Sequence, residues 1–64
     1  MAERIVGRMQ TPDGLWTIEA VHDYRGDWYR LIHGERVMED HLVIGSLHYF
    51  IDQYGIDAAA LVEE

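Results

Sequence analysis

The chain has 64 residues, of which 48% are hydrophobic, and a formal net charge of −7 from 12 acidic residues and five arginines. It contains no cysteine and no lysine, which excludes disulfides, thiolate metal sites, and cysteine or lysine nucleophiles. A chain of this length builds one hydrophobic core, so we expect a single domain over residues 1–64. Since no apolar run approaches the roughly 18 residues of a membrane span and residues 1–4 lack a secretory signal pattern, we expect a cytoplasmic protein without membrane association.

Two strands joined by a tight turn are predicted at the N-terminus. Residues 4–9 and 15–22 are rich in Ile, Val, Trp and Thr, and the second segment alternates between two sets of side chains. Between them stands Pro12-Asp13-Gly14, a sequence typical of a turn between strands. A glycine inside a strand, here Gly7, marks a bulge or the close approach of another group, such as a tryptophan laid across it.

Two further strands follow in the same antiparallel order. Residues 23–27 form a polar connection that contains glycine, and residues 28–33 are again strand-like. Gly34 and Glu35 permit another turn, after which residues 36–38 begin a short fourth strand. The pattern therefore predicts a meander of three or four strands.

The next segment changes to helical spacing. Its apolar residues recur at intervals of three and four: Val43, Leu47, Phe50, Ile51 and Tyr54. The helix could open at Glu39-Asp40 or at Ser46 as N-cap, and we favour Ser46 because Gly45 inside a helix costs about 1 kcal/mol. Gly55 is predicted to end the helix in a left-handed conformation, with Ile56 making an apolar contact. Asp57 then caps a short final helix over residues 58–63.

These elements define an α+β class: a three- to four-stranded antiparallel meander packed against one C-terminal amphipathic helix, with a short final helix. The helix is the only sizeable element that can cover one face of the sheet. The expected core also includes at least one tryptophan. Its other members are Ile5, Ile18, Ala20, Leu31, Leu47, Ile51 and Leu61.

Catalytic and metal-binding patterns are weak. The four histidines are His22, His33, His41 and His48. Only His48 and Asp52 form an i, i+4 pair on a predicted helix, which supplies two of the three or four ligands that zinc needs. The single serine, Ser46, is expected to be a cap. We therefore expect no metal, no cofactor, no catalytic residues and no enzymatic activity.

An aromatic and arginine-rich set is the candidate partner-binding site. Trp, Tyr and Arg dominate the energetically important positions of protein interfaces. The set comprises Trp16, Tyr24, Arg25, Trp28, Tyr29 and Arg30. In the competing structural interpretation, Trp16 and Trp28 are cross-strand neighbours that bury one another, and the arginines are rim charges.

The charge distribution ranks the possible functions. Residues 1–34 carry five acids and four arginines (net −1), whereas residues 35–64 carry seven acids and one arginine (net −6). We predict a non-catalytic protein-interaction module that binds a protein partner through an aromatic sheet face or its acidic helical half. Self-association through residues 4–9 or the fourth strand is part of this prediction. The alternatives are nucleic-acid binding by the arginine-bearing sheet, which the net charge disfavours, and inhibition of a DNA-binding protein by acidic DNA mimicry.

Overall fold

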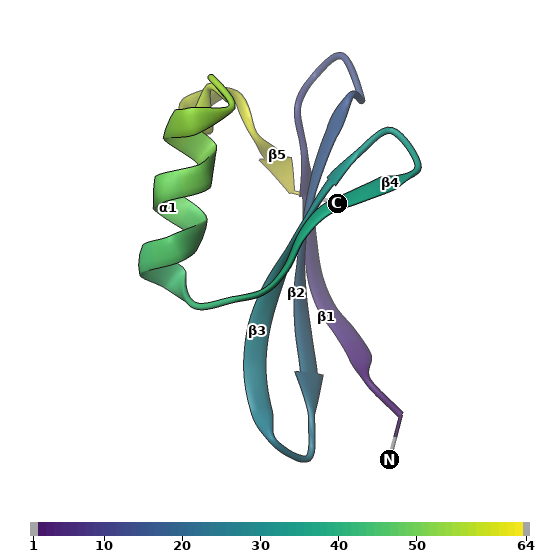
Figure 1. The fold of residues 1–64 in the computed structure, drawn as a ribbon. Helices are drawn as coiled ribbons and strands as arrows, with labels where there is room; N and C mark the ends of the chain where they lie inside the picture. The colour runs from purple at the N-terminus through teal and green to yellow at the C-terminus, as the bar shows by residue number, and fades with distance from the viewer. Residues whose placement is uncertain (1, 64) are drawn as a thin grey trace.

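The computed structural model describes residues 2–63 and consists of an antiparallel sheet with one helix along one side (Figure 1). The strands are β1 (Arg4–Gln10), β2 (Trp16–Asp23), β3 (Gly26–His33), β4 (Arg36–Leu42) and β5 (Val62–Glu63). The helices are α1 (Ile44–Gln53) and a single 3-10 turn, η1 (Ala58–Ala60). The strand order is β4-β3-β2-β1-β5. The α+β class and the meander are confirmed, and β5 is an additional strand beside β1. Within residues 2–63, no helix is long and apolar enough to span a membrane.

The predicted turn between β1 and β2 is present and is held by Asp13. The amide of Gly14 donates to the carbonyl of Thr11 at 2.9 Å, with Pro12 and Asp13 at the two central positions. The Asp13 carboxylate accepts hydrogen bonds from the Thr11 hydroxyl at 2.6 Å and from the Leu15 amide at 3.0 Å. These donors, with the Thr11 hydroxyl first, hold the pKa of Asp13 below its ordinary value.

The bulge expected at Gly7 is also present. The register between β1 and β2 shifts between Ile5 and Gly7, so that Val6 is an extra residue in β1. A Cβ placed on Gly7 would lie 3.6 Å from the Cβ of Ala20. The close neighbour of Gly7 is therefore Ala20, and the prediction of a tryptophan across this glycine is wrong.

The pairing of β2 with β3 determines which side chains share a face of the sheet. Ile18 faces Leu31 on the side that α1 covers. Because successive residues of a strand point to opposite faces, Glu19 lies on the other side, opposite Arg30. We call this second side the open face, since none of the described helices lies over it; it carries Arg8, Glu19, Val21, Trp28, Arg30 and Asp40.

The hydrophobic core lies between the sheet and α1. Its buried members come from β2, β3, β4, α1 and the segment after α1: Ile18, Leu31, Leu42, Leu47, Ile51 and Ile56. Four predicted core residues are confirmed in this cluster, and Trp16 and Leu61 pack against it. The prediction for Ile5 is wrong, because the bulge places it opposite Val21 on the open face, where it is 46% exposed. Ala20 is only half-buried.

The fourth strand is longer than predicted and the helix starts earlier. β4 continues to Leu42, which pairs with Tyr29 and is buried. α1 then begins at Ile44, with Val43 as N-cap and no side-chain hydrogen bond at the cap. Both predicted starts, Glu39-Asp40 and Ser46, are wrong. Strand pairing extends through Leu42, so the helix must begin at once to bring its first inward residue, Leu47, onto the sheet.

The end of α1 follows the prediction. Gly55 has a φ of 69°, and its amide donates to the carbonyl of Asp52 at 3.1 Å. The amide of Ile56 donates to the carbonyl of Ile51 at 3.0 Å, and both of these side chains are in the core cluster. This pair of hydrogen bonds with an apolar contact is the Schellman motif.

The final segment differs from the predicted helix over residues 58–63. The Asp57 carboxylate caps η1 by accepting from the Ala59 amide at 3.1 Å. The helical turn stops at Ala60, and Val62 and Glu63 pair with β1 at Gln10 and Met9. The prediction is wrong here because a free edge of β1 offers these residues strand pairing, which local helix propensity does not register.

Candidate functional site

The predicted partner-binding residues do not form one surface, and two of them belong to the core side of the sheet. Trp16 and Tyr29 both pack against the core cluster. The ring of Trp16 lies 4.5 Å from that of His33 and 5.0 Å from that of Tyr54. The interpretation that Trp16 and Trp28 bury one another is wrong, because Trp16 faces His33 while Trp28 lies on the opposite side of the sheet.

Trp28 is the centre of a second, smaller cluster on the open face. Its side chain is buried although none of the described helices lies over it. The guanidinium carbon of Arg25 lies 5.4 Å from its ring, and the ring of His41 stacks on it at 4.7 Å. Its indole nitrogen donates to Asp40 at 3.2 Å. Of this predicted set, Tyr24 is the most exposed, at 75%, in the turn between β2 and β3.

Arg25 is held by a buried carboxylate. Asp23 accepts hydrogen bonds from the backbone amide of Arg25 at 2.8 Å, and from its side-chain Nε and Nη2 at 3.0 and 2.8 Å. Burial raises the pKa of Asp23, but the hydrogen bonds from Arg25 outweigh it, so the pKa is lowered overall. Arg25 is therefore committed to closing the β2–β3 turn and covering Trp28.

Arg30 joins three carboxylates across the open face. Its side chain donates to Glu3 at 2.8 Å, to Asp40 at 3.2 Å and to Glu19 at 3.3 Å. Glu19 also accepts from Arg8 at 2.8 Å. The hydrogen bond to Glu3 raises the pKa of Arg30 against the opposing effect of burial. For Asp40, burial raises the pKa, but hydrogen bonds and the nearby positive charge lower it by more, so the pKa lies below its ordinary value. We call the five connected residues the ion network: Glu3, Arg8, Glu19, Arg30 and Asp40.

The histidines are dispersed. Nδ1 of His22 lies 2.6 Å from Asp27, and His33 and His41 are beside tryptophan rings. His48 is exposed on α1. Over residues 2–63, no three His, Asp or Glu side chains are grouped as metal ligands.

The outer edge of β1, one of the two places where the sequence predicted self-association, is only partly covered in the structure. β5 pairs only with Met9 and Gln10. From Arg4 to Gly7, no strand in the described part of the chain pairs with this side of β1. Ile5 and Val6 are 46% and 58% exposed. An unpaired stretch of strand presents free N–H and C=O groups that can template another strand.

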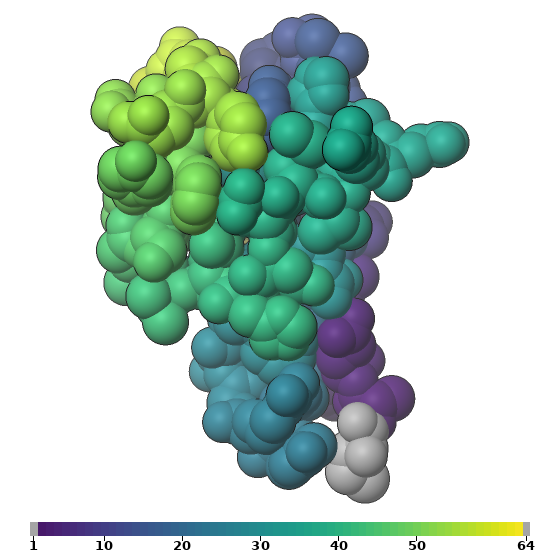
Figure 2. All heavy atoms as spheres, in the orientation of Figure 1, coloured from purple at the N-terminus to yellow at the C-terminus, as the bar shows by residue number. Residues whose placement is uncertain are grey.

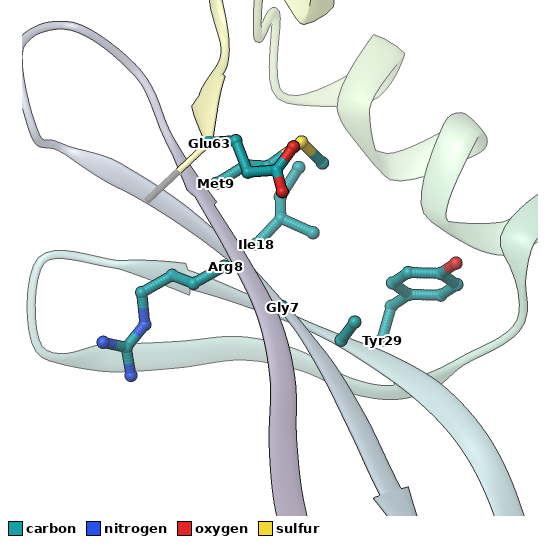
Figure 3. Close-up of a pocket in the computed structure, with 7 residues that line it drawn as sticks. Gly7, Arg8, Met9, Ile18, Tyr29 and Glu63 are labelled. Carbon is teal, nitrogen blue, oxygen red and sulfur yellow. The ribbon is translucent and has the colours of Figure 1, made fainter.

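An apolar cavity of about 170 Å³ lies beside this edge. It has residues of four strands in its lining: Gly7, Arg8, Met9, Ile18, Ala20, Tyr29 and Glu63. Figure 3 shows Met9, Ile18 and Tyr29 on one side of β1, with Arg8 pointing away from them. The cavity exists because α1 packs mainly on β3 and β4, while Gly7 and Ala20 are too small to fill the space over β1 and β2. We call it the β1 groove.

The shape of the molecule keeps this end of the sheet accessible. In Figure 2, α1 covers the upper left of the visible face and β4 lies beside it, while the β2–β3 turn and the start of β1 project beyond the helix at the bottom. The principal extents of 33 × 22 × 20 Å reflect this projection.

No protein-family model, curated protein or solved structure matches the chain. Functional inference therefore depends on the geometry of the described residues.

Proposed function

We propose that the chain is a non-catalytic protein-interaction module, and that it binds an extended segment of a polypeptide along the open edge of β1. The observation that carries this proposal is the stretch from Arg4 to Gly7, which no described strand pairs on its outer side, beside an apolar groove. In strand addition, backbone hydrogen bonds provide affinity, and pockets for alternate side chains provide specificity. The β1 edge offers backbone groups for hydrogen bonds, and the β1 groove offers a pocket for a side chain.

Gly7 connects these two parts of the site. Because Gly7 has no side chain, a residue facing it on an added strand can lie across it into the β1 groove. There the side chain would meet Ala20 and Tyr29. Glu63 lies at the margin of the same groove and makes no ion pair within residues 2–63. An apolar stem that ends in a positive charge fits this combination of surfaces.

The state of the arginines favours protein binding over nucleic-acid binding. Affinity for a phosphate backbone comes from Lys and Arg side chains that are available to neutralise it. Arg8, Arg25 and Arg30 each bind a carboxylate of the same chain. In the described residues, Arg4 and Arg36 are the arginines without such a partner, and they lie on opposite edges of the sheet. The sheet therefore offers little free positive charge for DNA or RNA.

The acidic half of the chain is likewise partly committed to structure. Glu39 accepts a hydrogen bond from the Tyr54 hydroxyl at 3.1 Å, Asp40 belongs to the ion network, and Asp57 caps η1. These roles remove three carboxylates from any phosphate-like array. This weakens the case for DNA mimicry relative to the β1 edge.

Site-specific photo-crosslinking in cells of the source organism tests the proposal. Val6 is replaced by a benzoylphenylalanine, and the matched control carries the same group at Tyr49, which is equally exposed at 58% but lies on α1. We expect protein adducts from position 6 and few from position 49. Equal yields at both positions, or none at position 6, would contradict binding at the β1 edge.

A further inference from the structure

The bulge in β1 restricts how another strand can pair with it. Glu3, Ile5 and Arg8 lie on the open face, whereas Arg4 and Gly7 lie on the side that α1 covers. In an antiparallel pair, residues that face one another must point to the same side of the sheet. A regular strand meets this condition with its own copy only when a residue faces itself or a residue an even number away. When two facing residues lie on either side of the bulge, they must instead be an odd number of positions apart, because the bulge adds one residue between them.

We propose that β1 binds β1 of a second copy of this chain, antiparallel, with residues 3–8 facing residues 8–3. This inference rests on the proposed function and names the extended segment that the edge binds. In this register Glu3 faces Arg8 on the open face, and Arg4 faces Gly7 on the side of α1. It is the register that pairs the longest stretch before β5, which occupies the edge at Met9 and Gln10.

Charge complementarity supports this register. Glu3 and Arg8 have opposite charges and are 46% and 41% exposed, so each can reach across the pair. They occupy two margins of the ion network, in which Arg30 and Glu19 lie between them. The two-fold pairing therefore joins the networks of the two copies through two Glu3–Arg8 contacts. Opposite charges that face each other across strands are stabilising.

The other facing pair fills the β1 groove. Arg4 makes no ion pair in the described part of its own chain, and Gly7 leaves the space above it empty. Arg4 of the second copy would lie over Gly7 with its apolar stem against Tyr29. Its guanidinium would point towards Glu63, which faces Met9 two residues further along β1. This one register thus brings Arg4 of the second copy over Gly7 and towards Glu63 of the first copy.

The opposite edge of the sheet does not offer the same pairing, so the assembly closes as a dimer. The register of β4 on β3 shifts twice, and His41 in β4 has a φ of 53°. Bulges and irregular backbone blunt an edge against strand addition. A surface that pairs with its own copy gives a closed two-fold dimer, not a fibre.

Sedimentation of the purified chain over a concentration series tests the dimer. The paired stretch is short and the interface small, so we expect reversible dimers with a dissociation constant of roughly 10–100 µM. Val6→Lys places two charges near the two-fold axis and should weaken the dimer at least tenfold. The control, Tyr49→Lys, changes an equally exposed residue on α1 and should leave it unchanged. Circular dichroism of each variant verifies the fold.

Disulfide trapping tests the register independently, since the chain has no cysteine of its own. Purified Arg4→Cys and Gly7→Cys chains are mixed and oxidised, and a mixed disulfide dimer is expected at a higher yield than from either chain alone. A mixture of Arg4→Cys with Tyr49→Cys is the control. Equal yields in the two mixtures, or a dimer insensitive to Val6→Lys, would overturn the proposed pairing.

The two proposals fail in different ways. A chain that sediments as a monomer up to millimolar concentration overturns the dimer. If its Val6 position still crosslinks other proteins in cells, the proposed function stands with a different partner. If the chain is monomeric and Val6 forms no adducts, both proposals are wrong.

Discussion

Replacing Gly45 and Gly55 separately by alanine should change the stability of the domain in opposite directions. Neither position has a heavy atom within 4 Å of an added Cβ, so the two substitutions are matched sterically. Gly45 lies in the first turn of α1, where alanine gains about 0.5–1 kcal/mol over glycine. Gly55 has a φ of 69°, a conformation that costs a residue with a Cβ about 1–2 kcal/mol. For a domain of this size, these values correspond to a melting temperature raised by roughly 2–8 °C and lowered by roughly 4–16 °C, respectively.

Thermal and urea unfolding followed by far-ultraviolet circular dichroism at pH 7 measure both changes. The two sites lie at opposite ends of α1, so the double variant should show nearly the sum of the single effects. The result for Gly45 also tests where the helix begins. If Gly45→Ala gave no increase in stability, a helix starting after Ser46 would regain support, and the reasoning from the observed start at Ile44 would be refuted.

Three further changes probe the parts that surround the site. Arg30→Lys should destabilise the domain by about 1–2 kcal/mol in urea unfolding, because an ammonium group cannot match the three directions of the guanidinium; an unchanged midpoint would contradict this role. Burial raises and hydrogen bonds lower the pKa values of Asp23 and Asp40, and the lowering prevails. The ionised carboxylates of Asp23 and Asp40 therefore stabilise the fold above the unfolded pKa near 3.8, and this stabilisation is lost as the pH falls through their lower folded pKa values. The melting temperature should decrease when the pH is lowered beneath about 4; an increase there would refute the assignment. Asp57→Ala should cost about 1 kcal/mol, whereas Asp57→Asn should retain most of the stability, because both Asp and Asn cap helices; hydrogen exchange of the β5 amides should be faster in the alanine variant alone.

The features predicted correctly from the sequence are those that a few neighbouring residues determine. The Pro12-Asp13-Gly14 turn closes through hydrogen bonds among adjacent residues. Gly55 and Ile56 end α1 because one needs a positive φ and the other reaches back to the last turn. Such interactions are visible in the sequence because both partners lie within it at a fixed, short spacing.

The features predicted wrongly depend on pairing between distant segments. The alternation of β1 suggests that Ile5 points inward, but the bulge at Val6 reverses the faces on either side of it. Local propensity places Val62 in a helix, yet it pairs with Gln10, 52 positions earlier. Neither the bulge position nor the partner of a short strand is encoded in a local pattern, so both depend on the folded register.

The division of the predicted partner-binding residues between two faces follows from the assignment of three of them to one strand. Trp28 and Tyr29 are neighbours in one strand, so their side chains point to opposite faces and cannot share a binding surface. The same holds for Tyr29 and Arg30. The two-residue period of a strand is therefore enough, by itself, to divide the aromatic and arginine-rich set between the two faces of the sheet.

The open face explains why we propose binding at an edge of the sheet and not on a face. A sheet face without a covering helix normally leaves large apolar side chains exposed, and such patches mark binding surfaces. Here Arg25 and His41 cover the indole of Trp28, and Arg30 bridges the carboxylates beside it. Side-chain pairs thus serve on this face as the second layer that α1 provides on the other. With both faces occupied, the outer side of β1 from Arg4 to Gly7 still has backbone groups that no described strand pairs. This is why we propose strand addition to β1 as the function.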